Sequence, residues 1–262
     1  MAQTSPTMNV MIAAARKAAR ALARDFGEVE NLQVSRKGPC DFVTAADVKA
    51  EKTLFEELSK GRPGYSFLME ERGAGEGSDK THRWIVDPLD GTTNFLHGLP
   101  HFAISIGLER EGVLVAGVVF NPVRDELFWA EKGAGAYLND RRLRVAGRND
   151  LRDALIATGI PYHGRPGHEV FLQEAERIMG KTAGVRRFGA ASLDLAYVAA
   201  GRFDGFWERG LSAWDVAAGA VLVREAGGVV NEIDGGDFMK TGAVLAANAT
   251  LAPLLAKTLR EG

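Results

Sequence analysis

A chain of 262 residues with 46% hydrophobic and 25% charged side chains has the composition of a globular protein, which excludes a disordered or fibrous one. A formal net charge of −2 implies no basic surface for nucleic acid from bulk charge, which leaves a local basic patch open, and no run reaches the roughly 18 apolar residues of a membrane span. The single cysteine, Cys40, excludes an intrachain disulfide framework and favours a reducing compartment, so we expect a cytoplasmic protein.

The N-terminal part of the chain predicts two helices. Residues 8–27 are rich in alanine, methionine and leucine, and residues 47–60 place apolar side chains at helical spacing before a glycine stop signal. The first segment is also rich in arginine and lacks acids over most of its length, as in a mitochondrial transit peptide. Its acidic continuation through Asp25, Glu28 and Glu30 favours a first helix of the folded protein instead.

The middle of the chain predicts a surface loop followed by antiparallel strands. Residues 71–83 are polar and glycine-rich, which indicates a mobile surface loop. Their glycines do not follow a strand and open a helix, as a nucleotide-binding turn requires. Residues 102–145 contain four short β-rich runs separated by turn signals, which predict an antiparallel meander.

The second half of the chain alternates between strands and helices, which predicts an α/β arrangement. Strands are expected at 154–159, 184–188, 202–208, 227–233 and 243–248, and helices near 167–180, 190–201, 214–226 and 249–260. The boundary near residues 146–151 lacks a linker rich in proline or serine. We therefore expect an N-terminal α+β lobe, residues 1–147, and a C-terminal α/β lobe, residues 148–262, that share an extended interface.

The stretch WIVDPLDGTTNF, residues 84–95, carries the strongest chemical signal. Its apolar start indicates a buried strand, which places Asp87 at the strand end, where Pro88 stops the hydrogen-bond ladder. Asp90 follows three residues on, and two close carboxylates repel each other unless a cation lies between them. Hard divalent cations such as Mg²⁺ take oxygen ligands, and the carbonyl of Leu89 offers a third one. The alternative is a polar turn held by aspartate side-chain hydrogen bonds.

Further acids stand where other predicted elements begin or end. Glu70 and Glu71 follow the apolar run YSFLM, so a second strand also ends in carboxylates. Asp215 opens a helix, where an aspartate either caps the helix or belongs to the same site as the other acids. Thr44 and Asp47 fit a helix capping box first and a supporting role at the site second.

Two histidines offer a different metal site. His97 and His101 have the four-residue spacing of zinc ligands on one helical face. Gly98 and Pro100 lie between them and disfavour a regular helix. Zinc is therefore not expected here.

Five segments together closely resemble the inositol monophosphatase family of magnesium-dependent, lithium-sensitive sugar phosphatases. They follow the family's order across most of the chain and are DFVTAAD (41–47), SFLMEE (66–71), WIVDPLDGTTNF (84–95), HFAISIGL (101–108) and WDVAAGAVLVREAGG (214–228). The resemblance implies a layered α/β/α/β/α sandwich, hydrolysis of inositol 1-phosphate and related small sugar or polyol phosphates, and a homodimer.

The resemblance also implies roles for individual residues. Carboxylates and one carbonyl would bind two Mg²⁺ ions: Glu70, Asp87 and Leu89 the first, and Asp87, Asp90 and Asp215 the second. Glu70 would also hold water for a weaker third ion. Two metals about 3.5–4 Å apart stabilise both the attacking and the leaving oxygen of an in-line displacement. Thr92 and Glu70 would orient the attacking water, so no covalent intermediate is needed.

The remaining implied contacts are to the phosphate and the sugar. Backbone N–H groups of Gly91 and Thr92 would hold phosphate oxygens where a helix begins. Substrate contacts would come from Glu70, Leu89, Asp90, Gly91, Thr92, Gly189, Ala190, Ala191, Glu208 and Asp215, with support from Asp41, Thr44, Asp47 and either Lys37 or Arg36. Many members carry serine or threonine where this chain has Ala190, so one hydroxyl contact of the family is absent.

The resemblance leaves other activities open. Related phosphatases act on fructose 1,6-bisphosphate, histidinol phosphate or 3′-phosphoadenosine 5′-phosphate, and the segment DGTTNF followed by LHGLPHFAISIGL favours the inositol branch over the nucleotidase branch. Some bacterial relatives also bind the transcription machinery, so an interaction protein is the alternative from another class. Magnesium-dependent phosphate release discriminates between an enzyme and such a protein.

Overall fold

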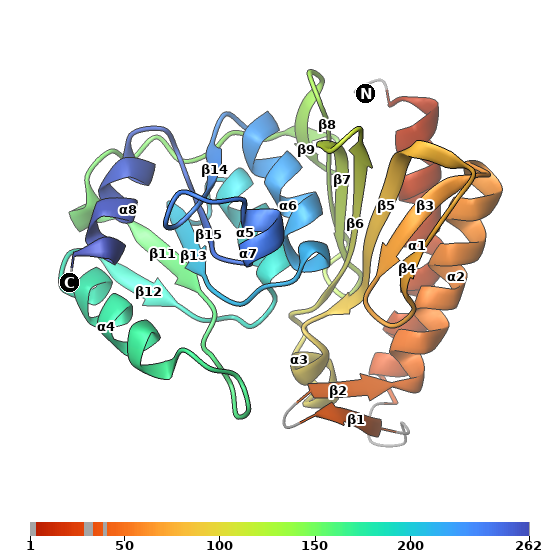
Figure 1. Ribbon diagram of the computed structural model, residues 1–262, viewed down its shortest axis with the longest axis horizontal. Helices are drawn as coiled ribbons and strands as arrows, with labels where there is room; N and C mark the ends of the chain where they lie inside the picture. Colours follow the sequence, from red (N-terminus) through yellow and green to blue (C-terminus); the bar gives the residue numbers. More distant parts are fainter. Residues whose placement is uncertain (1–3, 29–33, 39–40, 262) are drawn as a thin grey trace.

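Helices and sheets alternate in five layers in the computed structural model, which describes residues 4–28, 34–38 and 41–261 (Figure 1). Hydrophobic clusters fill the spaces between successive layers. The outer, central and far helical layers are formed by α1 (Pro6–Phe26) with α2 (Ala45–Gly61), α5 (Ala191–Ala199) with α6 (Ala213–Glu225), and α4 (His168–Met179) with α8 (Leu251–Arg260). The layered α/β/α/β/α sandwich expected from the sequence is confirmed.

The first sheet separates the outer helices from the central ones. Within the described residues it has eight strands in the order β10-β9-β8-β7-β6-β5-β3-β4, and its neighbours run antiparallel except for β3 and β5, which are parallel. The strands are β3 (Tyr65–Met69), β4 (Gly73–Gly75), β5 (Asp79–Asp90), β6 (Ala103–Arg110), β7 (Val113–Asn121), β8 (Glu126–Glu131), β9 (Gly135–Leu138) and β10 (Arg141–Arg142). The predicted meander is therefore present as β6 to β10.

The second sheet lies between the central helices and the pair α4 and α8 (Figure 1). Its strand order is β12-β11-β13-β15-β14, with β11 parallel to β12 and β13, and β15 antiparallel to its two neighbours. The strands are β11 (Leu155–Thr158), β12 (Gly184–Arg186), β13 (Gly205–Glu208), β14 (Val229–Glu232) and β15 (Val244–Ala247). A separate antiparallel pair, β1 (Val34–Gly38) and β2 (Asp41–Thr44), lies below the first sheet in this view.

Helix α6 packs unusually close to its neighbours, and small residues permit this. A Cβ atom at Gly107 on β6 would lie 2.7 Å from the Cβ of Ala217 on α6. A Cβ atom at Gly219 on α6 would lie 2.5 Å from the Cβ of Leu195 on α5. The alanine-rich helix thus lies against both the first sheet and α5, which brings its first turn to the end of β5.

Two expectations for local structure need correction. Residues 71–83 are not a surface loop, because Gly73–Gly75 pairs with β3 and β5 already begins at Asp79. Strand β5 does not end at Asp87 but continues to Asp90. Pro88 is accommodated because the pairing with β6 shifts register there, and a residue in such a bulge needs no ladder N–H.

Two short helical segments of the fold were not predicted from the sequence. They are the 3₁₀ turn η2 (Leu151–Asp153) and the short helix α7 (Phe238–Thr241). The segment proposed as a first helix forms α1, which buries its methionine and alanine face against the first sheet. No described helix combines the length and the apolar composition of a transmembrane span.

Candidate active site

A cavity of about 440 Å³ opens where the ends of several elements converge. The end of β5, the short helix α3 (Thr92–Leu96), the starts of α5 and α6 and the end of β13 all contribute to its wall. We call it the catalytic cavity. Its wall contains the following sequence-predicted site residues: Glu70, Asp87, Leu89, Asp90, Gly91, Thr92, Gly189, Ala190, Ala191, Glu208 and Asp215.

Three aspartates form the centre of this cavity. One carboxylate oxygen each from Asp87, Asp90 and Asp215 lies within 4.8 Å of the other two. Asp87 and Asp90 come from the end of β5 and are only 2% and 9% exposed, whereas Asp215 comes from the first turn of α6. Carboxylates so close together repel each other when ionised, and burial adds a desolvation cost.

The pKa values reflect this crowding. Burial raises the pKa of Asp87 well above its usual range, and the charges of Glu70, Asp90 and Asp215 raise it further. Burial raises the pKa of Asp90 to about 6, although two hydrogen bonds from Ser192 oppose the rise. Burial, followed by the charge of Asp90, raises the pKa of Asp215 to about 8.

The donor set fits a hard divalent cation. Every side chain in the three-aspartate group offers oxygen only, which is the ligand type that Mg²⁺ prefers. A cation would neutralise charges that the protein alone leaves strongly repelling. Glu70, at the end of β3, lies in the cavity wall and adds to the raised pKa values of Asp87 and Asp215, but it is outside the three-aspartate group.

The turn after β5 is fixed by local hydrogen bonds. Asp87 Oδ1 accepts a hydrogen bond from the backbone N–H of Leu89 at 2.8 Å. Gly91 has a φ of 90°, and a Cβ atom there would lie 3.0 Å from the carbonyl oxygen of His101, so glycine is needed at this position. Helix α3 begins at Thr92, as predicted.

Thr92 has the most informative contacts of this turn. Its Oγ1 lies 3.0 Å from the carbonyl oxygen of Leu89 and 3.3 Å from Oδ1 of Asp47. Both neighbours can only accept hydrogen bonds, so the single hydroxyl proton of Thr92 points towards them. The lone pairs of Oγ1 can then accept a hydrogen bond from another group. Asp47 is fully buried and its Oδ1 lies beside Thr92, and its supporting role at the site stays a prediction.

The opposite wall is formed by residues 189–191 and Glu208. Asn94 on α3 donates from Nδ2 to the carbonyl oxygens of His101 and Phe188, at 2.8 Å each, and thereby holds this wall against the turn after β5. The carboxylate of Glu208 packs onto Gly159, where an added Cβ would lie 1.8 Å from Oε1. Desolvation, followed by the charges of Asp215 and Asp90, raises the pKa of Glu208 to about 8.

Some sequence-predicted residues lie elsewhere or outside the described part. Lys37, Asp41 and Thr44 belong to the strand pair β1 and β2, but their side chains lie outside the described part of the structure. Cys40 lies wholly outside the described residues. Helix α2 begins directly after Thr44, where a capping residue would stand.

The two histidines are not on one helical face. Helix α3 ends at Leu96, so the spacing of His97 and His101 is not helical. The ring Nδ1 of His97 lies 2.8 Å from the carbonyl oxygen of Thr93. Burial lowers the pKa of His101 to about 4.

Sequence reasoning missed several residues of the site. Ser192 donates from its backbone N–H and from Oγ to Oδ2 of Asp90, at 2.7 and 2.5 Å. Tyr162, Arg165 and Arg187 line the cavity. Ser192 directly follows the predicted contact residues Gly189, Ala190 and Ala191 in the sequence, so a serine at the start of a predicted helix was a usable signal. No sequence motif around Tyr162, Arg165 or Arg187 indicates that these residues belong to the site.

Replacing Ser192 by alanine is expected to lower activity by about 10–100-fold, the usual cost of losing a residue that orients a ligand. The Asp90 carboxylate would keep the hydrogen bond from the backbone N–H but lose the one from Oγ and be oriented less firmly, so the metal concentration for half-maximal activity should rise. Steady-state kinetics at varied Mg²⁺ measures both effects. Ser78→Ala, at an exposed serine in the turn before β5, is the control. An unchanged metal requirement would contradict this role for Ser192.

Comparison with known proteins gives a consistent result. The model of the inositol monophosphatase family matches residues 3–262. An inositol-1-monophosphatase from Mesorhizobium japonicum is 62% identical over 98% of this chain and 97% of its own length. A protein named Nus factor SuhB from Pseudomonas aeruginosa is 46% identical over 97% of this chain and 96% of its own. The crystal structure of the extragenic suppressor protein suhB from Bartonella henselae superposes with a TM-score of 0.96, at 57% identity, over 98% of this chain and all of that one.

Proposed function

This chain belongs to the inositol monophosphatase family, and we propose that its catalytic cavity hydrolyses inositol 1-phosphate and related small polyol and sugar phosphates with the help of bound Mg²⁺. The chain is a phosphoric monoester hydrolase. One observation carries the assignment of the site: three aspartates with closely spaced oxygens lie beside Gly91 and Thr92 in a cavity of about 440 Å³. That volume accommodates a small phosphate ester.

The metal ligands that we propose are those of the acidic wall. Asp87, Asp90 and Asp215 would hold one ion, and Glu70, Asp87 and the carbonyl of Leu89 would hold another, with a third, weaker ion beside Glu70. When bound, such ions supply a nucleophile at neutral pH and neutralise charge on the attacking and leaving oxygens. The oxygen-only donor set and the raised carboxyl pKa values support this proposal.

Residues of the chain would position the reactants. Thr92 Oγ1 gives its proton to Leu89 or Asp47 and is therefore an acceptor for a proton of the attacking water. Glu70 would accept the other proton of this water and would remove it as the water oxygen attacks phosphorus. The backbone N–H groups of Gly91 and Thr92 would hold the phosphate oxygens, which fixes the ester for in-line attack.

The opposite wall would bind the alcohol part of the ester. Glu208 and the backbone of residues 189–191 would contact its hydroxyls, and Arg165 and Arg187 add positive charge at the cavity wall. Ala190 offers no hydroxyl, so a ring hydroxyl that meets serine or threonine in other members would lack one partner here. This predicts a broader choice of polyol than in members with that hydroxyl.

The test of this function is phosphate release from a panel of monoesters with and without Mg²⁺. We expect the highest kcat/KM for inositol 1-phosphate, ahead of fructose 1,6-bisphosphate, histidinol phosphate and 3′-phosphoadenosine 5′-phosphate. Chelation should abolish turnover of all of them. Lithium, a small hard cation that competes for carboxylate oxygens, should inhibit at millimolar concentration. Metal-independent turnover would contradict the proposed site, and insensitivity to lithium would place the chain in a divergent branch.

A second role is favoured by one comparison. The relative from Pseudomonas aeruginosa is named Nus factor SuhB, and this name places that relative with the transcription machinery. We propose contact with that machinery as an additional role that does not need the carboxylates. Co-purification of RNA polymerase with the wild type and equally with an inactive Asp90→Asn variant would support this contact with the transcription machinery, and absence from both would contradict it.

A homodimer and a cytoplasmic location stay predictions of the sequence.

A further inference from the structure

A second cavity of about 260 Å³ adjoins the catalytic cavity, and we call it the distal cavity. The two cavities share part of their walls: Gly159, Ile160, Tyr162, Arg165 and Glu208 line both. Glu208 is the residue that we place beside the alcohol part of the ester. The distal cavity therefore begins where that alcohol would lie and leads away from the three aspartates.

The walls of the distal cavity that are not shared are largely apolar. Phe171 from α4 and Trp207 from β13 lie with nearly parallel rings, whose centroids are 6.4 Å apart at an angle of 13°. Pro161 and Pro166 contribute from the loop between β11 and α4. These four residues do not line the catalytic cavity.

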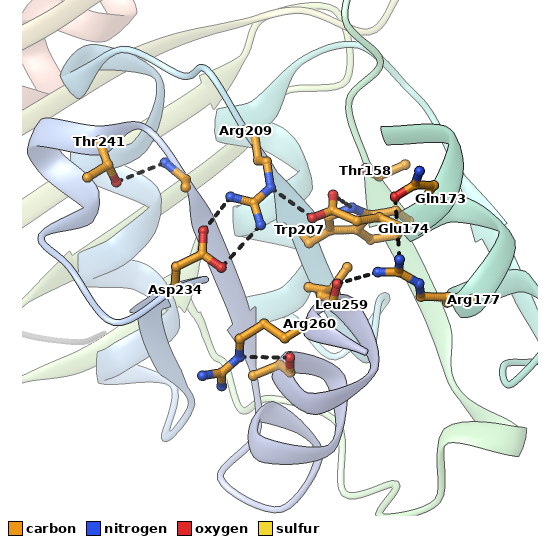
Figure 2. Close-up of polar contacts among 12 residues, drawn as sticks. Thr158, Gln173, Glu174, Arg177, Trp207, Arg209, Asp234, Thr241, Leu259 and Arg260 are labelled. Atoms are coloured by element: carbon orange, nitrogen blue, oxygen red, sulfur yellow. Dashed lines mark hydrogen bonds and ion pairs between the residues drawn. The ribbon is translucent and has the colours of Figure 1, made fainter. Parts of the chain in front are cut away.

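The charged groups beside the distal cavity are paired with each other. Figure 2 shows Arg209 between Glu174 and Asp234, with Nε 2.8 Å from Glu174 Oε1 and Nη1 2.6 Å from Asp234 Oδ2. The indole N–H of Trp207 donates to the other oxygen of Glu174 at 3.3 Å. Because these charges neutralise one another, the cavity does not present a free cation or anion from Glu174 or Arg209 to a ligand.

Arg165 forms the rim that the two cavities share. Its Nε donates to the hydroxyl of Tyr162 at 2.8 Å, and its Nη1 donates to the carbonyl oxygen of Gly210 at 2.5 Å. These contacts tie the loop between β11 and α4 to the segment after β13. The loop thereby becomes a wall of the distal cavity.

We propose that the distal cavity is a second substrate subsite, which accepts an aromatic or compact apolar ring carried by the alcohol of a phosphate monoester. The proposal rests on the proposed function, because it assumes that the phosphate lies at the three aspartates. The size is suitable, since an apolar cavity of about 150 Å³ already admits benzene. The enzyme would then hydrolyse arylalkyl phosphates in addition to polyol phosphates, with a ring between Phe171 and the loop.

The first test compares substrates that differ only in the ring. Propyl phosphate is matched against benzyl, 2-phenylethyl and 3-phenylpropyl phosphates, so that the spacer length that reaches the cavity is found. For the best of them we expect kcat/KM about tenfold above propyl phosphate, because burial of one phenyl ring is favourable by at least that factor. The gain should be in KM. Equal kcat/KM for all four would overturn the proposal.

The second test removes one wall of the distal cavity. Phe171→Ala is expected to lose most of the tenfold preference for the ring and to leave kcat/KM for inositol 1-phosphate within about twofold of the wild type. Phe171→Leu preserves more of the packing on α4 and should lose the preference in part, which covers the case in which the alanine variant folds poorly. Leu172→Ala is the control, because Leu172 is the next residue of α4 and is 65% exposed. Equal losses on both substrate types would overturn the proposal.

Binding of the alcohol alone separates this proposal from the proposed function. We expect 3-phenyl-1-propanol to bind the wild type saturably in calorimetry and to lose binding in Phe171→Ala. If the wild type hydrolyses inositol 1-phosphate but does not bind the alcohol, the subsite is wrong and the function stands. If no monoester is hydrolysed while the alcohol binds, the function is wrong, and the cavity is not a substrate subsite.

Discussion

Replacing Asp90 by asparagine is expected to lower kcat by about three orders of magnitude without unfolding the protein. Asp90 shares the centre of the catalytic cavity with Asp87 and Asp215, and its carboxylate is one of three that can surround a cation. A bound ion contributes several kcal/mol of charge stabilisation in the transition state, and each 1.36 kcal/mol corresponds to a factor of ten in rate. The amide has almost the same volume but carries no charge, so it weakens the site without leaving a cavity.

The stability of this variant gives an independent check. In metal-free buffer, Asp90→Asn should melt at or above the temperature of the wild type, because one of three repelling carboxylates is removed. The amide oxygen can still accept the two hydrogen bonds from Ser192. Asp140→Asn, at an exposed turn between β9 and β10, is the matched control and should change neither rate nor melting temperature. Wild-type turnover in Asp90→Asn would show that the metal ligands are assigned wrongly.

The acidic centre could be predicted because its signal is local in the sequence. Asp87 and Asp90 lie three residues apart behind an apolar run, and this spacing favours a shared cation over the alternative of a polar turn. Asp215 lies far away in the sequence and had two readings, as a helix cap and as a site residue. The fold shows the cap, since Oδ2 accepts a hydrogen bond from the backbone N–H of Ser212 at 2.7 Å, and it places a carboxylate oxygen within 4.8 Å of the other two aspartates, as the proposed site requires.

The residues that orient the acids could not be predicted in the same way. Ser192 reaches Asp90, and Asn94 joins α3 to Phe188, across about one hundred residues of sequence. Such contacts depend on how α5 and the turn after β5 are placed by the sheets, and residue spacing carries no information on that. The family resemblance could identify the acids because, like residue spacing, it depends on short segments of sequence.

The errors in secondary structure have a physical cause as well. Composition favoured a loop at residues 71–83, but Gly73–Gly75 is an edge strand, where a glycine-rich backbone can pair even though its side chains do not pack. Proline was read as the end of β5, yet Pro88 lies in a bulge of the pairing with β6. In both cases hydrogen bonding to a neighbouring strand outweighed the local conformational propensity. Helix α6 packs closely on Gly107 of β6, whereas the division into two lobes near residue 147 stays a prediction of the sequence.

Removal of the metal is expected to make the stability of the protein fall as pH rises. In the metal-free fold, the pKa is about 6 for Asp90 and about 8 for Asp215 and Glu208, and it is raised well above its usual range for Asp87. In the unfolded chain, aspartate and glutamate titrate near pH 4. Because the folded state keeps protons that the unfolded state has lost, the stabilisation is complete below about pH 4 and is lost as pH rises through about 6 to 8.

The size of this effect follows from the same pKa shifts. A tenfold change in the acid dissociation constant between the folded and the unfolded state corresponds to about 1.4 kcal/mol, so a loss of several kcal/mol of folding free energy is expected across the interval. At roughly 2–4 °C per kcal/mol for a chain of this size, the melting temperature should fall by about 10 °C. Carboxylates must be deprotonated to bind a cation, so the increase in melting temperature on adding Mg²⁺ should grow over the same interval.

The measurement is the melting temperature with EDTA and with saturating Mg²⁺, taken from about pH 5 to about pH 8.5, where the raised pKa values place the change. The difference between the two curves removes the titration of surface groups, which is common to both. Asp215→Asn lacks a group that titrates near pH 8, so its metal-free curve should be flatter at the alkaline end than that of the wild type. A difference that does not depend on pH would contradict the acidic cluster as the site of metal binding, because a cation held elsewhere would not compete with these protons.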